Sequence, residues 1–251
     1  MNRWVGGVLV LASLTGLYGC GSSETRSAAA ALPLAQVDTV NGATISGSVR
    51  FPGEAPAMPV IDMSSNPTCE RQHAGRRAEV VLVNANHTLR NTFVWIASGL
   101  PAARWPAPST VAHLDQTGCT YQPHVQGVMV GQTLEISNSD PVNHNVHAES
   151  RVNPAWNESE PPRAEMREKR FLEQEVLIPV SCSVHPWMRS YVGVVAHPFF
   201  AVTGDDGTFR MQGVPPGTYQ LEAVHERFGR KQISVTVVPK QSRVVDFTYG
   251  S

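Results

Sequence analysis

Short apolar stretches that alternate with turn residues run through the chain, and this pattern restricts it to a β fold. The apolar positions of residues 45–51 alternate up to the turn residues Pro52 and Gly53. The 20 glycines and 19 prolines are spread over 251 residues, which suits many short strands better than long helices. We therefore predict an all-β protein whose length suits about two small domains.

Similar runs predict further strands over residues 80–83, 91–97, 219–224, 233–238 and 243–249, with a hairpin turn at Asp205-Asp206-Gly207. Residues 162–175 are rich in Glu, Arg, Lys and Met. This segment is compatible with a charged helix and equally with an ordered surface loop.

The first residues have the pattern of an export signal. An uncharged apolar stretch over residues 4–17 follows the basic Arg3. It is shorter than the roughly 20 apolar residues that a membrane-spanning helix needs. We predict a signal peptide over residues 1–19 and a flexible tether, rich in Ser and Ala, over residues 20–40.

The stretch ends in Leu17-Tyr18-Gly19-Cys20, which resembles the lipobox of bacterial lipoproteins. The resemblance implies cleavage before Cys20 and a diacylglyceryl group on its sulfur. It places the chain on the periplasmic side of a bacterial membrane, and Gly21 after the cysteine weakly favours the outer membrane. The alternative is an ordinary secreted protein in which a cysteine stands at this position by chance.

The charge balance excludes a nucleic-acid partner. Lys and Arg total 20 against 21 Asp and Glu, and no basic run occurs. A protein that binds nucleic acid needs a positive surface to meet the phosphates, and nothing in the sequence supplies one.

The strongest chemical pattern lies in the middle of the chain. His144 is followed, after an excursion, by Cys182-x-x-His185-x-x-Met188 in one short stretch. Two imidazoles, one thiolate and one thioether are the ligands of a blue-copper site, in which the methionine is a weak axial ligand. We predict one copper ion held by these four residues.

These residues resemble the cupredoxins, most closely the group of amicyanin, pseudoazurin and plastocyanin. The resemblance implies a Greek-key sandwich over residues 106–197 and a type 1 (blue) copper site. The resemblance also makes Asn145 the residue that holds the ligand loop in place. It also implies that His185 reaches the surface as the port for the electron, with apolar surface from Pro186 and Trp187 beside it.

The two ends of the mature chain resemble the carboxypeptidase regulatory-like domain, a small transthyretin-like sandwich. The resemblance rests on Ile45-Ser-Gly-Ser-Val and on Thr203-Gly-Asp-Asp-Gly-Thr-Phe with Val214-Pro-Pro-Gly-Thr-Tyr. We assign residues 41–105 and 198–251 to this sandwich, so that the copper domain is inserted in it. A tandem order of the two domains is the alternative.

The cysteine count predicts one disulfide. Once Cys20 is lipidated and Cys182 binds copper, Cys69 and Cys119 remain as an even pair in an oxidising compartment. Three rival assignments stay open. Cys182 can form a disulfide, His147 can replace His144 as a ligand, and Cys119 with His124 can form a second metal site.

No pattern predicts an enzyme. His225-Glu226 does not begin a zinc-protease motif, because position 229 is Gly, and no His-x-His pair of multicopper oxidases occurs. We expect His197 and His225 to be structural. The predicted function is a membrane-anchored carrier of single electrons between periplasmic redox proteins, with partners steered by the charged segment 149–175. The alternatives are a copper-binding or delivery protein and a metal-free structural or interaction lipoprotein.

Overall fold

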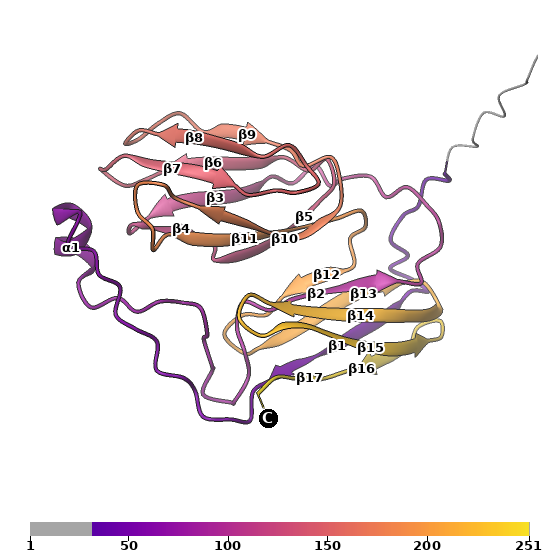
Figure 1. Ribbon diagram of the computed structural model, residues 1–251. Helices are drawn as coiled ribbons and strands as arrows, with labels where there is room; N and C mark the ends of the chain where they lie inside the picture. Colours follow the sequence, from indigo (N-terminus) through magenta and orange to yellow (C-terminus); the bar gives the residue numbers. More distant parts are fainter. Residues whose placement is uncertain (1–31, 251) are drawn as a thin grey trace, which may run out of the picture. The chain divides into compact units, whose positions relative to one another are not determined.

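Two β-sandwiches make up the part of the chain that the computed structural model describes, residues 32–250 (Figure 1). The predicted all-β class is confirmed, and α1 (Pro67–His73) is the one α-helix of the described residues. No helix within this range is long and apolar enough to cross a membrane. The predicted signal peptide and Cys20 lie outside the described residues.

The first sandwich consists of two four-stranded sheets. One sheet has the order β13-β1-β16, with β17 also paired to β1, and the other has the order β12-β2-β14-β15. The strands are β1 (Ala43–Arg50), β2 (Phe93–Ser98), β12 (Phe200–Val202), β13 (Thr208–Val214), β14 (Gly217–His225), β15 (Gly229–Val237), β16 (Ser242–Val244) and β17 (Phe247–Thr248). Alternate side chains of both sheets, among them Ile45, Phe209 and Leu221, fill the space between them.

The second sandwich also has two sheets, with the orders β5-β11-β10-β7-β8 and β4-β3-β6-β9. The strands are β3 (Ala112–Thr117), β4 (Thr120–Gln122), β5 (Val125–Met129), β6 (Leu134–Asn138), β7 (His144–Ala148), β8 (Trp156–Glu160), β9 (Arg167–Lys169), β10 (Glu175–Ser181) and β11 (Arg189–Val195). Its core includes Leu114, Ile136, Val146 and Val192.

The order of the strands along the chain shows how the two sandwiches are connected. Strands β1 and β2 of the first sandwich precede all nine strands of the second, and β12–β17 follow them. In chain order, the strands of the second sandwich therefore lie between β2 and β12 of the first. Trp105 on the entering segment and Phe199 on the leaving segment pack on each other, with ring centroids 5.0 Å apart, so the two ends of the insertion lie close together.

Two local predictions need correction, and one choice that the sequence left open is settled. Residues 80–83 form no strand, only an isolated bridge between Val83 and Leu89. The charged segment 162–175 contains no helix and is a surface loop with the short β9. The end of the predicted tether is not free, because Leu34 bridges Arg104 and the Ala35 N–H donates to the Arg104 carbonyl at 2.9 Å.

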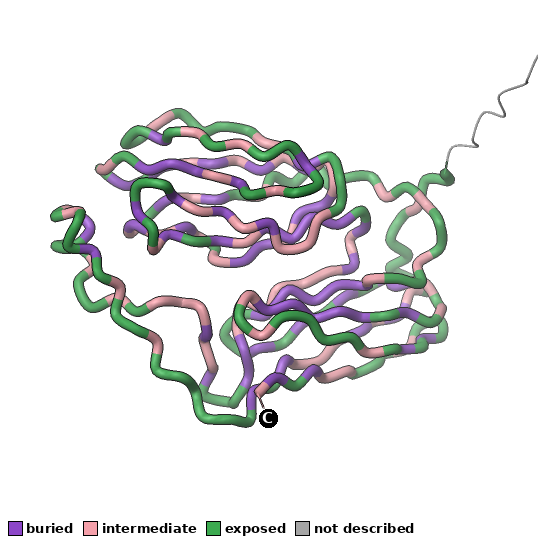
Figure 2. Tube along the Cα trace, in the orientation of Figure 1, coloured by how far each residue is buried: buried purple, intermediate pink, exposed green. Residues whose placement is uncertain are grey.

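The connection between β1 and β2 is unexpected, because it carries α1 across to the second sandwich. Figure 2 shows this connection largely exposed, with few buried positions. Met63 and Cys69 of this connection are fully buried, and both pack with Cys119 of the second sandwich. The helix begins at Asn66-Pro67, a sequence pattern of an N-cap followed by proline in the first turn.

Strand β2 is buried on both faces because it lies between two cores. Val94 and Ile96 point into the first sandwich, whereas Phe93 and Trp95 pack towards the second. Phe93 stacks on Phe200 with ring centroids 5.7 Å apart. The two rings lie over Gly127 and Gly193, which are paired on β5 and β11. Glycine is needed at both positions, because a side chain there would collide with the rings.

We expect Gly193→Ala to destabilise the protein by about 1–3 kcal/mol, the usual cost of overpacking a filled interior. A Cβ at this position would lie 2.5 Å from the Phe93 ring. Urea unfolding measures the effect. Gly204→Ala is the matched control, because a Cβ there meets nothing within 4 Å. Equal stability of the two variants would contradict this account of the contact between the sandwiches.

Candidate metal centre

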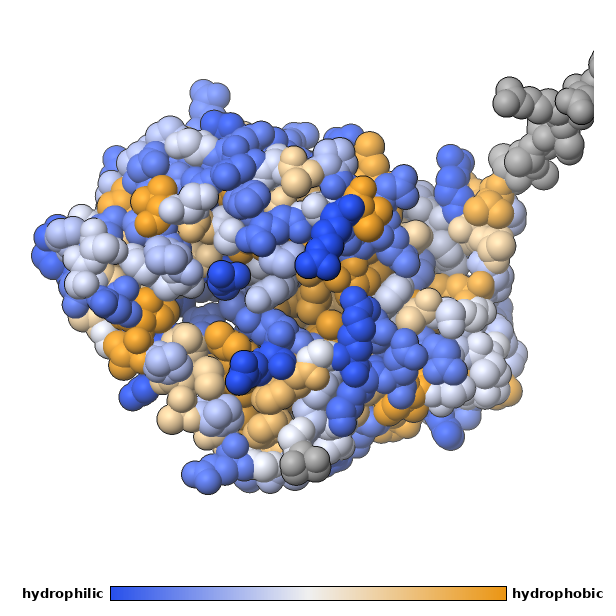
Figure 3. Space-filling model, in the orientation of Figure 1, coloured by the Kyte–Doolittle hydropathy of each residue, from blue (hydrophilic) through white to orange (hydrophobic). Residues whose placement is uncertain are grey.

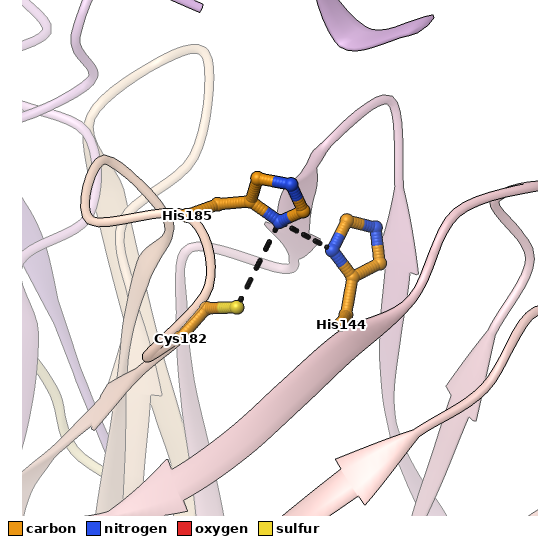
Figure 4. A group of neighbouring side chains, drawn as sticks. All are labelled: His144, Cys182 and His185. Carbon is orange, nitrogen blue, oxygen red and sulfur yellow. Dashed lines mark hydrogen bonds between the residues drawn. The ribbon is translucent and has the colours of Figure 1, made fainter. Parts of the chain in front are cut away.

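Four predicted ligands come from two places in the second sandwich. His144 is the first residue of β7, Cys182 directly follows β10, and Met188 directly precedes β11. His185 lies in the loop between β10 and β11. Figure 4 shows the His144 and His185 rings and the Cys182 sulfur directed at one another. The Nδ1 atoms of the two histidines are 2.9 Å apart, and Cys182 Sγ lies 3.8 Å from His185 Nδ1.

All four side chains are buried. His144 and Met188 have no exposed surface, His185 is 1% exposed and Cys182 is 4% exposed. The loop that carries three of them is closed by its own backbone. The Met188 N–H donates to the His185 carbonyl at 2.9 Å, and the Cys182 N–H donates to the Met188 carbonyl at 3.3 Å. The loop from Cys182 to Met188 therefore has little freedom to move.

The thiol of Cys182 is set up to be ionised. Burial alone raises the pKa of a thiol, because it disfavours the charged form. Contacts with the side chains of His144 and His185 and with the backbone of His185 and Asn145 outweigh burial and lower the pKa of Cys182 to about 5. A thiolate is the form that binds metals.

Asp140 orients His144 from the side opposite to the cluster. Its carboxylate lies 2.9 Å from His144 Nε2 and accepts the backbone N–H groups of Gly118 and Cys119 at 2.8 Å each. Burial disfavours a charged His144, but the contacts with Asp140 and Cys182 raise the pKa of this imidazole. The carboxylate holds the Nε2 proton of His144 and so leaves Nδ1 available to the cluster.

Asn145 fixes the start of the ligand loop. Its side-chain oxygen accepts the backbone N–H of Ser183, and its side-chain nitrogen donates to Asn157 on β8. The Tyr121 hydroxyl donates to the Asn145 carbonyl at 2.5 Å. These bonds tie β7 to the residue that follows Cys182.

The rival assignments do not form around this cluster. Strand alternation on β7 places His147 on the face opposite to His144, and it is not in the group formed by His144, Cys182 and His185. The sulfur of Cys119 is bonded to Cys69, with the Cα atoms 5.8 Å apart, and Cys182 is the free cysteine of the described residues. His124 pairs with Glu226 of the first sandwich instead of Cys119.

Two histidines of the first sandwich have structural hydrogen bonds. His197 Nε2 lies 2.9 Å from the Ile96 carbonyl, and its Nδ1 accepts the Phe199 N–H. His225 Nδ1 accepts the Arg227 N–H at 3.1 Å. Burial lowers the pKa of both imidazoles to about 4, so both are neutral near pH 7.

His185 is not at the surface, contrary to the expectation from the cupredoxin resemblance. Its Nε2 lies 2.8 Å from the side-chain nitrogen of Asn66, the N-cap residue of α1. The Trp187 ring packs against it with centroids 5.0 Å apart, and the Trp187 N–H donates to the Cys119 carbonyl. The connection between β1 and β2, held by the disulfide, covers the edge that was predicted to be open. Sequence reasoning missed Asn66, although Asn66-Pro67 is a recognisable helix start.

The donor set fits a copper ion in its chemistry. One thiolate, two imidazole nitrogens and a buried methionine from the same loop match the soft and borderline donors that copper prefers. The 2.9 Å between the two Nδ1 atoms is a hydrogen-bond distance. Two nitrogens bound tetrahedrally to one ion lie about 3.3 Å apart, so the rings need to separate only slightly.

A family model described as "Carboxypeptidase regulatory-like domain" matches residues 192–250. The resemblance of the C-terminal region to that family is confirmed. No curated protein matches the chain.

Among solved structures, the chain is similar to a Cu-containing nitrite reductase from Thermus scotoductus SA-01, with 21% identity and a TM-score of 0.32. The match covers 42% of this chain and 26% of the reductase, so the chain spans about a quarter of that protein. It is also similar to a purple cupredoxin from Nitrosopumilus maritimus, with 23% identity, a TM-score of 0.29 and coverage of 33% and 98%. An amicyanin mutant in the Cu(I) state matches with 24% identity, a TM-score of 0.30 and coverage of 40% and 97%.

In the metal-free protein we expect Cys182 to titrate near pH 5 instead of near its ordinary pKa of 9.0. The thiolate absorbance in the ultraviolet, taken as a difference from Cys182→Ser, measures the midpoint. Between these two values the unfolded chain binds one more proton than the folded one, so the thiolate's contribution to stability increases as the pH rises from about 5 to about 9. A midpoint near 9 would show that the histidines do not stabilise the thiolate.

Proposed function

We propose that the protein is a type 1 copper protein that carries single electrons, with His144, Cys182, His185 and Met188 as the ligands. The observation that carries the proposal is the convergence of two imidazole nitrogens and a low-pKa thiol in one buried cluster. When bound, copper supplies a one-electron couple between Cu(I) and Cu(II). Because the chain itself provides four donors, the site lacks the open position that substrate activation generally needs, and we propose no bond chemistry.

The residues around the cluster restrict its movement. Asp140 fixes the orientation of His144, Asn145 fixes the backbone after Cys182, and the loop up to Met188 is closed by two backbone hydrogen bonds. Ligands held in this way change position little between two oxidation states, which keeps the reorganisation small when an electron moves. The Cys182 thiolate needs no external base.

The test is the visible spectrum of the soluble protein, residues 21–251, after addition of Cu(II). We expect an intense thiolate-to-copper band that is lost in Cys182→Ser, because the sulfur is the source of the transition. His147→Ala is the matched control, since His147 lies on the other face of β7, and it should keep the band. A colourless wild-type protein would contradict the proposal.

A second candidate is a copper-binding or delivery protein. The burial of His185 favours it, because an electron carrier usually exposes the outer edge of this histidine to its partner. The self-exchange rate between the Cu(I) and Cu(II) forms separates the two. Fast exchange with full retention of the metal supports the carrier. Slow exchange with transfer of the ion to a competing chelator supports delivery.

We also propose that the protein is exported, lipid-anchored at Cys20 and located on the periplasmic side of the membrane, where it meets redox partners. The disulfide between Cys69 and Cys119 supports an oxidising compartment. On the face shown in Figure 3, apolar residues form small groups among polar ones, which suits brief contacts with a partner.

The anchor is tested with Cys20→Ala in a bacterial host. We expect the wild-type protein to incorporate a labelled fatty acid and to sediment with membranes, with more in the outer than in the inner membrane. The variant should do neither, because no other thiol follows the apolar stretch directly. Equal labelling of both proteins would contradict lipidation at Cys20.

A further inference from the structure

The side chain of Asn66 has both of its polar atoms in use. Its oxygen accepts the backbone N–H groups of Thr68 and Cys69 at 3.1 and 3.2 Å, the usual role of an N-cap residue. Its nitrogen lies 2.8 Å from His185 Nε2. An amide nitrogen only donates, so His185 Nε2 must accept and has no proton.

This contact decides where the proton of His185 lies. A neutral imidazole has one proton, which must then be on Nδ1. Two acceptors are available to it: His144 Nδ1 at 2.9 Å and Cys182 Sγ at 3.8 Å. His144 in turn directs Nε2 to Asp140. With either acceptor, the proton of His185 points into the cluster and away from Asn66.

His185 in this state is not ready to bind a metal through Nδ1. A nitrogen that binds a metal ion carries no proton, so the single proton of the ring would have to be on Nε2. An N–H group of His185 would then face an N–H group of Asn66. His144 needs no such change, because Asp140 already holds its proton on Nε2. Metal binding at His185 Nδ1 is therefore incompatible with the hydrogen bond from Asn66 to His185 Nε2.

We propose that Asn66 is a latch that holds α1 over the metal-free site and is displaced when His185 takes a metal ion. The inference rests on the proposed function. Asn66 has two ways to avoid the conflict. It can turn its amide and give up the N–H groups of Thr68 and Cys69, or it can move away from the ring. Both loosen the first turn of α1 or its contact with the site.

The disulfide sets the limit of this movement. Cys69 lies in the first turn of α1 and stays bonded to Cys119, so the helix can loosen but cannot leave. Met63 and Ile61 of the connection pack with Val142 and Trp187 of the second sandwich in a small apolar cluster. Opening exposes the Nε2 edge of His185 beside this cluster. A redox partner that docks there therefore meets the loaded protein and not the metal-free one.

Amide hydrogen exchange followed by NMR tests the latch in the full soluble protein. Cu(I) is added without oxygen and without a thiol, so that the disulfide stays intact. We expect the amides of Thr68 and Cys69 to exchange about two- to thirtyfold faster after loading, the factor that corresponds to loss of an N-cap. Copper content and the Cu(II) spectrum are measured on the same sample.

Asn66→Ser is the decisive variant, because serine caps a helix as well as asparagine but is too short to donate to His185. In this variant, the amide exchange of Thr68 and Cys69 should be the same with and without Cu(I). Its affinity for Cu(I), measured against a competing chelator, should be about two- to tenfold higher than that of the wild type, since no hydrogen bond has to be broken. Asn41→Ser, at an exposed position of the first sandwich, should behave like the wild type.

The outcomes separate the two proposals. If copper binds with its thiolate band but the exchange of Thr68 and Cys69 stays the same or slows, the latch is wrong and the copper protein stands. If no copper binds through Cys182, both are wrong. Faster exchange in the wild type that is equally large in Asn66→Ser would also overturn the latch, because α1 would then loosen without the contact between Asn66 and His185.

Discussion

A buried thiolate must be stabilised by its surroundings, and the second sandwich is arranged around this requirement at Cys182. Removing a negative charge from water is costly unless hydrogen bonds or positive charge replace the solvent. At Cys182 the side chains of His144 and His185 and the backbone of His185 and Asn145 take the place of the solvent. His144 can take part because Asp140 orients it, and His185 can do so because the ligand loop folds back through Met188.

Asp140 connects this cluster to the rest of the molecule. The same carboxylate that orients His144 also binds the backbone of Gly118 and Cys119, and Cys119 is the anchor of the connection that carries α1. The disulfide that anchors the cover over His185 therefore lies next to the carboxylate that orients His144. We infer that the electrostatics of the site and the position of its cover depend on one buried side chain.

The first sandwich acts on the site through this cover. It is the host into which the second sandwich is inserted, and the contact between them is a filled surface of Phe93 and Phe200 against two glycines. It also supplies the connection from β1 to β2, which reaches across to the ligand loop. In the cupredoxin resemblance, the edge of the second histidine is the electron port. In this protein that edge is covered by the connection between β1 and β2 of the first sandwich, so its accessibility depends on both sandwiches.

The sequence by itself determined the all-β class, the turns of the first sandwich and the identity of the candidate ligands. Alternation and turn residues depend on local backbone preferences, and a Cys-x-x-His-x-x-Met loop brings its donors together over a few residues. The contact of Asn66 with His185 spans 119 residues, and no local pattern specifies it. The same holds for Asp140 beside Cys119 and for the burial of His185. Only the tertiary structure decided them, because they depend on the path that residues 52–80 take between the sandwiches and on the disulfide that holds this path in place.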